Sequence, residues 1–503
     1  MDTVLIALGL VATLLVLDYL RLSLWSPLRS IPGPFSTRSS GLYRLSMVYR
    51  GNAPNNYREL HKRYGKIVRT GPNHVSISDP SAIPTVYGLG TAYLKTPFYS
   101  TMSPFYKGST MDSMFTTRDP SYHKALKTPV AQLFSMTNMR NYETYVDECS
   151  AIFVRSMKDL QGQSFDLAIW LQWYAFDVIA SLTFQRRFGF MENRVDVDNM
   201  ISGLDAGLRY VGVIGQYPGW HRFLMGNRIL METLATLIPN LPDPLNRFMQ
   251  ITEEEVQRYD NESKHDGRTD FLSQLRAKEA KDGKIPNRDM MNHLSNNLLA
   301  GSDTTAISLR ACFYYIIRTP RVYKRLVEEI DEAHHQGTLS EFITYEECLK
   351  LPYLQATIKE AMRMHPGVAF PLERLVPDNG ATLLGYHLPA RTNVSMSAPV
   401  IHYDKEIFGP DSHEFRPERW LESNAERMKI MDRALLTFGY GARTCIGKNI
   451  SIMEMGKFIP QILRNFEIEW ASSEPEWKTY AAWFWKQSDI IVKFSDRHKT
   501  DVA

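Results

Sequence analysis

The sequence has few cysteines, and this scarcity argues against a disulfide framework and against a structural zinc site. Its 503 residues contain only four, with no Cys-x-x-Cys pair. A disulfide-stapled secreted domain or a structural zinc site needs cysteines paired at short spacing. We therefore expect mostly buried free thiols at the four positions, which are Cys149, Cys312, Cys348 and Cys445.

An excess of either charge is also missing. Lysine and arginine together number 58, against 55 aspartates and glutamates, which leaves a formal net charge of +3. A chain so evenly charged has no broad positive field with which to bind a polyanion, so we expect no nucleic acid partner. The hydrophobic share of 44% and the charged share of 22% exclude a disordered or low-complexity chain.

The first thirty residues form a separate unit. The stretch Val4–Trp25 is largely apolar and suffices for the roughly 20 helical residues that cross a bilayer core. Positive charges do not precede it, as they would in a cleaved signal peptide, but lie near its end at Arg21 and after it at Arg29. By the positive-inside rule the rest of the chain is then cytosolic. A buried core helix is the alternative, but we favour an uncleaved single-pass anchor and hinge over residues 1–30, followed by one domain over residues 31–503.

The body that follows the anchor begins with a proline-rich segment and is then mostly helical. The segment Ile31–Pro34 (Ile-Pro-Gly-Pro) cannot continue a helix, so we expect a stiff, kinked spacer. Apolar spacing predicts helices over Asn138–Leu160, Ile169–Phe184, Met290–Arg318, Tyr353–Met364 and Lys448–Leu463. A hairpin is predicted over Lys66–Thr70 and His74–Ser78, with short strands over Thr382–Leu384 and Asn393–Ser397. The polar stretch Asn261–Asp289 is expected to be one surface connection, and the fold class mainly α with small β-sheets.

The longest predicted helix, Met290–Arg318, carries an unusual patch in its middle. Residues Ala300–Thr305 read Ala-Gly-Ser-Asp-Thr-Thr, two small residues followed by a carboxylate and hydroxyls. Such a patch is poor helix material, since glycine costs about 1 kcal/mol relative to alanine. Either the helix tolerates a kink there, with threonine bonding back to the preceding turn, or something flat packs against it.

The segment Phe438–Gly447 (Phe-Gly-Tyr-Gly-Ala-Arg-Thr-Cys-Ile-Gly) has the features of a thiolate ligand to a metal in an apolar pocket. Its first two glycines allow a tight loop close to a planar cofactor. Cys445 precedes the predicted helix Lys448–Leu463, where free N–H groups and the helix dipole favour an anion. Arg443 offers a fork for a carboxylate, and Phe438 can shield the sulfur from water.

This segment matches the haem-ligand signature of cytochromes P450, Phe-x-x-Gly-x-Arg-x-Cys-x-Gly, at every fixed position. The Ala300–Thr305 patch resembles the oxygen-activation motif of the family's central helix. Glu360 and Arg363 resemble its Glu-x-x-Arg pair, although Glu255–Arg258 has the same pattern and the motif alone carries little weight. The resemblance covers nearly the whole chain and is greatest to fungal microsomal P450s of the pisatin-demethylase-like kind.

The resemblance implies a P450 fold, with a long central helix over a buried haem b whose iron is bound by the thiolate of Cys445. It implies that Asp303 and Thr304 relay protons toward dioxygen, and that Gly301 leaves room for it. Arg419, in the segment that resembles the family's next motif, would join Glu360 and Arg363 in a buried structural network. The residues that would contact the haem are His123, Lys127, Ala300, Gly301, Phe438, Arg443, Cys445 and Gly447. Lys127 departs from the family's arginine and would offer a point charge.

The implied activity is that of a monooxygenase on a lipophilic small molecule, by hydroxylation, epoxidation or oxidative demethylation, in fungal secondary metabolism or detoxification. The chain has no dinucleotide-binding pattern, so electrons from NADPH would come through NADPH–cytochrome P450 reductase at the endoplasmic reticulum membrane, with cytochrome b5 as a further candidate donor. The docking face for the reductase would carry Lys124, Lys127, Arg140 and Lys448. Two alternatives stay open: a reductase-independent haem-thiolate hydroperoxide isomerase or dehydratase, and a tethered haem sensor or carrier.

The substrate pocket is predicted by analogy with the family. Its residues would come from the loop before His123, the central helix, the segment after the Glu-x-x-Arg helix and the C-terminal hairpin. The predicted set is Met102, Phe105, Met114, Phe115, Asn297, Val368, Ala369, Phe370, Trp483 and Phe484. This lining is apolar with one amide, which favours a lipophilic, partly oxygenated molecule.

Overall fold

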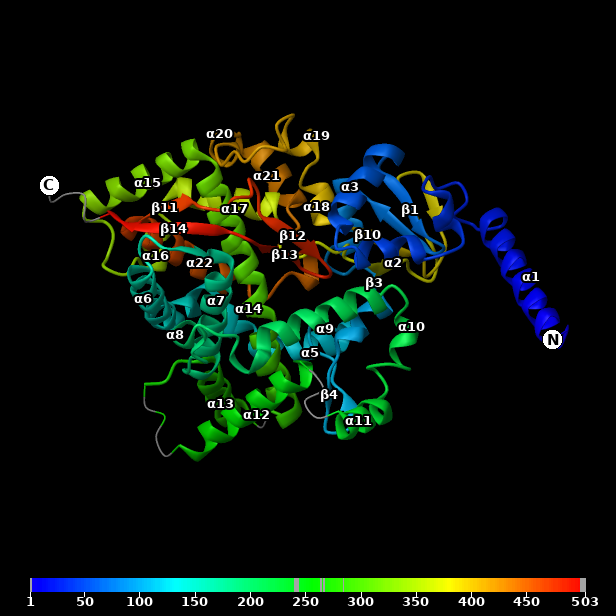
Figure 1. Ribbon diagram of the computed structural model, residues 1–503, viewed down its shortest axis with the longest axis horizontal. Helices are drawn as coiled ribbons and strands as arrows, with labels where there is room; N and C mark the ends of the chain where they lie inside the picture. Colours follow the sequence, from blue (N-terminus) through cyan, green and yellow to red (C-terminus); the bar gives the residue numbers. More distant parts are fainter. Residues whose placement is uncertain (1, 239–243, 263–264, 266, 284, 498–503) are drawn as a thin grey trace.

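The computed structural model describes residues 2–238, 244–262, 265, 267–283 and 285–497. They form a body of many helices with small separate sheets, and one helix that projects from the end of the body (Figure 1). The predicted fold class, mainly α with small β-sheets, is confirmed.

The longer helices of the body are α2 (Leu42–Tyr49), α3 (Ala53–Tyr64), α5 (Pro120–Val130), α6 (Glu143–Asp159), α7 (Leu167–Phe184), α9 (Met200–Ile214), α11 (Arg228–Leu237), α12 (Pro244–Asn261), α13 (Phe271–Asp282), α14 (Asn287–Arg318), α15 (Pro320–His335), α17 (Pro352–Met364), α21 (Ala425–Ala434) and α22 (Lys448–Asn465). Short helices are α4 (Ile83–Tyr87), α8 (Phe190–Asn193), α10 (Pro218–His221), α16 (Tyr345–Cys348), α18 (Ala398–Ile401), α19 (Lys405–Phe408) and α20 (Arg419–Glu422). The helices predicted from apolar spacing are confirmed, with ends that shift by a few residues.

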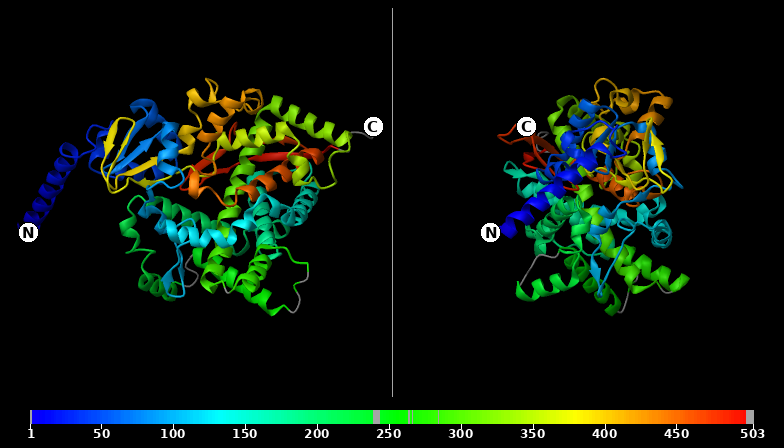
Figure 2. Two further views of the ribbon diagram at one scale, coloured as in Figure 1. Left: turned by 180° about the vertical axis from the view of Figure 1, so that it is seen from behind. Right: turned by 90° about the vertical axis from the view of Figure 1, so that its right-hand side faces the viewer.

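The core is built around α14, which runs through the middle of the body (Figures 1 and 2). It begins after Pro286 and ends at Arg318, before the Thr319-Pro320 pair, and it packs on α7, α17 and α22. The chain stays helical through Ala300–Thr305. Thr304 Oγ1 donates to the carbonyl of Ala300 at 2.8 Å, so the back-bonding that the sequence suggested occurs without interrupting the helix.

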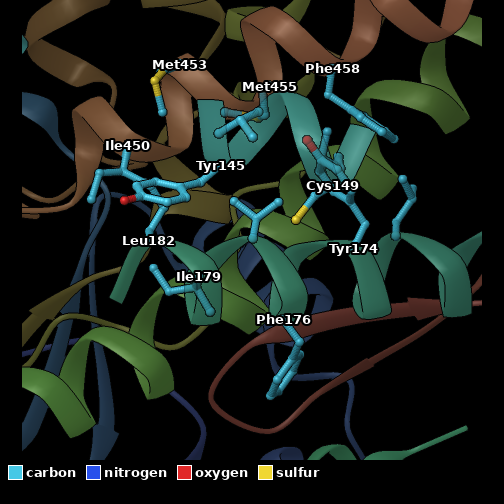
Figure 3. Close-up of a cluster of buried hydrophobic side chains, with 14 of the residues drawn as sticks. Tyr145, Cys149, Tyr174, Phe176, Ile179, Leu182, Ile450, Met453, Met455 and Phe458 are labelled. Atoms are coloured by element: carbon cyan, nitrogen blue, oxygen red, sulfur yellow. The ribbon is translucent and has the colours of Figure 1, made fainter. Parts of the chain in front are cut away.

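Beside α14, helices α6, α7 and α22 share one apolar core (Figure 3). The rings of Tyr174 on α7 and Phe458 on α22 stack with their centroids 4.0 Å apart. Cys149 of α6 lies buried among them, and Cys312 and Cys348 are also buried free thiols, as predicted. The segment at the N-terminus of α22 is therefore held by a tightly packed helix bundle.

The largest sheet has the strand order β1-β2-β10-β7-β3. Its strands are β1 (Ile67–Gly71), β2 (His74–Ile77), β3 (Leu94–Lys95), β7 (Arg374–Leu375) and β10 (Asn393–Met396). The antiparallel pairing of β1 with β2 confirms the predicted hairpin, while β10 lies parallel to β2. The remaining strands are β4 (Phe105–Tyr106), β5 (Ser109–Thr110), β6 (Ser164–Asp166), β8 (Ala381–Leu383), β9 (Tyr386–Leu388), β11 (Phe466–Trp470), β12 (Lys478–Ala481), β13 (Trp485–Ser488) and β14 (Ile491–Asp496).

The Ile-Pro-Gly-Pro segment is docked on β1 and is not a free spacer. The side chain of Ile31 is 2% exposed, and the backbone N–H of Arg69 donates to the carbonyl of Pro32 at 2.7 Å. A Cβ added to Gly33 would collide with the backbone of Arg69. Glycine is needed here for close approach of two backbone segments, and the role of the segment as a spacer at the membrane remains a prediction.

The helix α1 (Asp2–Leu24) projects from the body at the end nearest β1, in Figure 1 and in the left view of Figure 2. Of the described part of the chain, the helix that is long and apolar enough to cross a membrane is α7, but 89% of it is buried. We therefore regard α7 as a core helix. The anchor and the domain division at residue 30 remain predictions.

The polar stretch Asn261–Asp289 contains a helix, α13, so the expectation of a single surface connection is wrong. Asp270 caps this helix by accepting a hydrogen bond from the N–H of Ser273, and it is followed by Phe271 and Leu272, which are buried. The few apolar residues lie on the side that faces the core, and this is sufficient to hold a polar helix in place.

Candidate active site

The loop before α22 is closed by its own backbone. The N–H of Cys445 donates to the carbonyl of Phe438 at 2.8 Å. Gly439 and Gly441 have φ of +70° and +64°, the left-handed region that side chains disfavour. A Cβ on Gly441 would also collide with the carbonyl of Tyr87. Both glycines are thus required by the turn that brings the cysteine to the helix N-terminus.

The sulfur of Cys445 differs from the other three thiols in the chain, because its side chain is exposed and theirs are buried. Dense protein around it raises the pKa of the Cys445 thiol, and hydrogen bonds from the backbone N–H groups of Gly447 and Lys448 act in the opposite direction. The positive charges of Lys127 and Lys448 also favour the thiolate. An accessible sulfur with two N–H donors at a helix N-terminus is suited to bind a metal as thiolate.

Cationic side chains that pair with no carboxylate among the described residues gather near the same loop. The Lys95 side chain is 5% exposed; its ammonium donates to the carbonyl of Phe115 and lies 4.1 Å from the ring centroids of Tyr99 and Phe115. Burial and the charges of Arg374 and Arg443 lower the pKa of Lys95. Burial and the same Arg374 lower the pKa of Arg443 to about 10. These mutually repelling charges predict a bound anion.

His123 and Lys127 of α5 extend this basic cluster. Burial first, and then Arg443, Lys127 and Lys95, lower the pKa of His123 to about 4, which makes it a neutral hydrogen-bonding group. Lys127 Nζ donates to the carbonyl of Ala442 at 3.3 Å. A haem carries two carboxylates on one edge, and a cluster of cations and hydrogen-bond donors suits them. The basic cluster that could bind them consists of Lys95, His123, Lys127, Arg374 and Arg443. The residues present therefore fit a haem whose iron is bound at Cys445.

Lys95 and Arg374 were missed by the sequence reasoning. Arg374 directly follows Glu373 in a stretch that resembles the family, and this signal could have found it. The neighbouring Glu373 is occupied by Arg44, with which it forms a buried ion pair. Lys95 stands in no motif, and only the pairing of β3 with β7 brings it beside Arg374.

The carboxylate of Asp303 is bound to side chains from α7 and β13. It is fully buried, accepts a hydrogen bond from Nε2 of Gln172 on α7, and lies 2.9 Å from Nζ of Lys486 on β13. Thr304 is half-buried, and its hydroxyl needs only to rotate away from the Ala300 carbonyl to bind another acceptor. The roles predicted for Asp303 and Thr304 remain predictions, with Asp303 held in an ion pair that the sequence did not suggest.

The absence of a side chain at Gly301 has a reason in helix packing. A Cβ built on it would lie 2.6 Å from Cδ1 of Ile179, which comes from α7. The missing side chain therefore allows α14 and α7 to pack closely. The expectation that it leaves room for dioxygen remains a prediction.

The three residues of the predicted buried network lie together. Arg363 binds both carboxylate oxygens of Glu360, at 2.8 and 2.9 Å, and Arg419 Nε donates to Glu360 Oε1 at 2.8 Å. All three are at most 1% exposed. Trp420 Nε1 adds a fourth hydrogen bond at 2.9 Å. The network joins α17 to α20 and contacts no residue of the cysteine loop in these bonds, which favours a structural role.

The residues predicted to line the substrate pocket fall into separate groups. Met102, Val368, Phe370, Trp483 and Phe484 belong to one apolar cluster, with Phe115 touching Trp483 edge to face at 5.8 Å between ring centroids. Ala369 is buried next to the C-terminal hairpin, Met114 packs on the main core, and Phe105 pairs with Thr110 in the β4–β5 hairpin. Asn297 Nδ2 donates one hydrogen bond to the hydroxyl of Thr183 at 2.8 Å, which fixes the orientation of this amide.

The predicted docking face keeps most of its positive charges exposed. Lys124 and Lys448 are exposed, and Phe438 lies half-buried with its ring centroid 5.7 Å from Lys448 Nζ. Arg140 forms an ion pair with Glu346, which reduces its value as a free positive charge.

Comparison with known proteins places these features in one family. The chain matches the family model "Cytochrome P450" over residues 39–494. It is 36% identical over 475 residues to cytochrome P450 monooxygenase cicH of Emericella nidulans, covering 94% of each chain. It is 35% identical over 480 residues to pisatin demethylase of Fusarium vanettenii, covering 94% of this chain and 89% of the relative. It is also 34% identical to cytochrome P450 monooxygenase gsfF of Penicillium aethiopicum, covering 94% of both.

Proposed function

The chain belongs to the cytochrome P450 family, and we propose that it inserts one atom of O2 into a lipophilic small molecule by hydroxylation, epoxidation or oxidative demethylation. The family and its monooxygenase relatives establish the general activity. The observation that carries the proposal is the exposed thiol of Cys445, which faces two backbone N–H groups beside a cluster of unpaired cations.

The chain's own residues would hold the haem at its iron and at its acidic edge. Cys445 provides the thiolate, and the basic cluster of Lys95, His123, Lys127, Arg374 and Arg443 provides charge and hydrogen bonds for the propionates. A thiolate-bound haem supplies the activation of dioxygen and favours cleavage of the O–O bond. Phe438, half-buried next to the loop, limits the access of water to the sulfur.

Protons would reach the distal side of the haem along α14. The hydroxyl of Thr304 would give up its hydrogen bond to Ala300 in order to hold a proton at its own oxygen, and Asp303 would supply that proton. Because buried Asp303 contacts Lys486 and Gln172, it must change partners to do so. The apolar cluster around Phe370 and Trp483 would receive the substrate by burial of apolar surface.

The electrons would come from NADPH through NADPH–cytochrome P450 reductase, with cytochrome b5 as a further candidate donor. The exposed Lys124 and Lys448, on the cysteine side, would attract an acidic partner. The pathway would be fungal secondary metabolism or detoxification, as the names of some relatives suggest.

The proposed location is the endoplasmic reticulum membrane, with α1 as a single-pass anchor and the body in the cytosol. Apolar side chains on α1, including Ile6 and Leu10, are exposed at 67% and 61%. Trp220 of α10 and Ile229 of α11 are also exposed, at 63% and 77%. These two helices lie in the half of the body nearer α1, so both groups could meet one bilayer surface (Figure 1).

The test is the carbon monoxide difference spectrum of the reduced protein, beside that of Cys445→Ser. We expect the thiolate-type Soret band in the parent and its loss in the variant; a parent without this band contradicts the proposal. Cys348→Ser serves as control, since Cys348 is a buried thiol away from the loop. NADPH with reductase is then compared with a hydroperoxide alone. Turnover only with the hydroperoxide would instead indicate an isomerase or dehydratase.

A further inference from the structure

A cavity of about 300 Å³ lies between α5, α13 and the start of α14, and the proposed function uses none of the described residues that line it. The apolar part of its wall comes from Leu126 and Pro129 of α5 and from Ile285 and Pro286 before α14. Pockets that bind small molecules measure about 300–1,000 Å³, and a buried cavity of about 150 Å³ already holds a benzene ring. The cavity therefore has room for one ring with a short substituent.

Two hydrogen-bonding side chains on one face of α14 line this cavity. Asp289 and His293 are four positions apart, so they lie next to each other on the helix surface. His293 is 4% exposed, and its Nε2 has no hydrogen-bond partner among the described residues. The carboxylate of Asp289 forms no ion pair within the described part of the chain, and the neighbouring Arg288 donates instead to the carbonyls of Tyr106 and Thr110. Buried polar groups without partners are costly, so these two indicate a ligand.

The charges around the cavity favour a ligand that is itself neutral. Burial lowers the pKa of His293 to about 4, so its ring is uncharged at neutral pH. The carboxyl of Asp289 and the ammonium of Lys278, from α13, both line the cavity. An ion of either sign would be attracted by one of these two side chains and repelled by the other. A hydroxyl group can donate to the carboxylate or the imidazole and accept from the ammonium without carrying a charge.

The apolar wall and the polar groups together fit a phenol better than an aliphatic alcohol. A ring buries apolar surface with few rotatable bonds, so little conformational freedom is lost when it binds. A phenolic hydroxyl ionises near pH 10 and is a stronger donor to a carboxylate or an imidazole than an aliphatic hydroxyl. The chemistry of the cavity therefore matches a small phenol.

The helix α5 separates this cavity from the basic cluster. Ala125 and Pro129 of α5 line the cavity, whereas His123 and Lys127 belong to the basic cluster. Each of the two lining residues lies two positions from one of the cluster residues, and side chains at that spacing do not share a helix face. A ligand in the cavity would thus contact α5 on a different face from the one that serves the haem.

We propose that this cavity is a second ligand site, which binds a small phenol through Asp289 and His293 and acts as an effector site for haem retention. A bound phenol fills the space between α5 and the start of α14 and so holds α5 in place. His123 and Lys127 then keep their positions for the haem propionates, and the haem is released more slowly. The effect on the haem rests on the proposed function, whereas binding of the phenol does not.

The test uses the holoprotein with clotrimazole, an azole that coordinates haem iron, so that a phenol is kept out of the substrate pocket. Binding of para-fluorophenol is followed by fluorine NMR, and we expect saturable binding to the parent. Asp289→Ala and His293→Phe should each raise the Kd about tenfold, because each removes one hydrogen bond to the ligand. Ala125→Phe should abolish binding, since the larger side chain fills the cavity from an exposed position of α5.

Ala277→Phe is the matched control, because Ala277 of α13 is also exposed but lies outside the wall of the cavity, and this variant should bind the probe like the parent. Saturating para-fluorophenol should slow the release of haem to excess apomyoglobin severalfold in the parent and leave it unchanged in Ala125→Phe. No saturable binding to the parent, equal binding by Ala125→Phe and Ala277→Phe, or the same haem release from the parent with and without the probe would overturn the inference. Loss of the thiolate-type Soret band in the parent would instead overturn the proposed function.

Discussion

Gly301 lies against Ile179, and a Cβ on the glycine would come within 2.6 Å of Cδ1 of the isoleucine. The motif that the sequence associates with oxygen activation is therefore also the place where α14 and α7 pack without an intervening side chain. Ile179 is itself 2% exposed, so its end is enclosed by other parts of the protein. The glycine thus has a packing role that is independent of any chemistry.

Gly301→Ala should destabilise the protein by about 1–3 kcal/mol, the usual cost of overpacking a core. Ile179→Ala added to it should recover part of this loss, because it removes the two atoms that the new Cβ meets. Urea denaturation of the holoprotein measures both. Gly219→Ala is the matched control, since a Cβ there would meet nothing within 4 Å. An equal effect of the two glycine variants would contradict the packing role.

The buried network around Glu360 gives a second prediction. Arg363→Ala should cost about 3–5 kcal/mol, because it leaves the carboxylate of Glu360 buried without its main partner. Arg258→Ala removes the same kind of i,i+3 partner from Glu255, but Arg258 is 40% exposed and Arg186 also pairs with Glu255. We expect the Arg258 variant to lose less than about 1 kcal/mol. Equal urea midpoints for the two variants would contradict this expected difference in stability.

Glu454 of α22 makes the stability depend on pH. It is 1% exposed, its Oε1 has no hydrogen-bond partner among the described residues, and burial raises its pKa well above the ordinary value. The folded protein then keeps a proton that the unfolded chain has lost, so the free energy of unfolding falls as pH rises above about 4.5, by up to about 1.4 kcal/mol per pH unit. Glu454→Gln should reduce this slope and be the more stable protein at pH 8.

The measurement for Glu454 is a series of urea denaturations of the holoprotein between about pH 5 and 8, the range in which most proteins are stable. Glu426→Gln changes an exposed glutamate in the first turn of α21 and should leave the slope unchanged. A parent and a Glu454→Gln protein with the same slope would show that Glu454 is ionised in the folded state.

The part of the site that is local in sequence could be predicted, and the part that depends on tertiary contacts could not. The loop from Phe438 to Cys445 contains glycines whose positive φ angles the turn requires. The local motif was therefore sufficient to predict the loop. The long helix α14 followed from its apolar spacing. The contact of Lys486 with Asp303 joins residues 183 positions apart, and no local pattern indicates it.

The difference between local pattern and tertiary contact also explains what the sequence did not show at Gly301 and in α13. The motif around Gly301 does not tell which neighbour lies across the missing side chain, and here it is Ile179. The helix α13 was missed because its composition is polar, although Phe271 and Leu272 are buried. Tertiary burial outweighs local composition in such helices.

Thr304 gives a prediction about the chemistry. Its hydroxyl bonds only to the carbonyl of Ala300 in its own helix, so Thr304→Val should fold and retain haem. With NADPH and reductase we expect a severalfold higher ratio of hydrogen peroxide formed to NADPH consumed, and Thr304→Ser should restore the parent's ratio. The neighbouring Thr305 instead bonds to Ser451 of α22 at 2.8 Å, so Thr305→Val should lower stability without changing the ratio. An unchanged ratio in Thr304→Val would contradict the proton relay.

Lys95 provides a test of haem binding that does not depend on turnover. Its ammonium is buried beside Arg374 and Arg443, and no carboxylate among the described residues pairs with it. Such a charge is costly to bury unless an anion joins it, so the propionates of a bound haem would gain a strong partner. Lys95→Met should therefore release haem to excess apomyoglobin about tenfold faster than the parent, equivalent to about 1.4 kcal/mol. Lys124→Met changes an exposed lysine of α5 and should release haem at the parent's rate. If the two variants lose haem equally fast, the buried ammonium does not face the cofactor, and the positive charge above the cysteine loop needs another explanation.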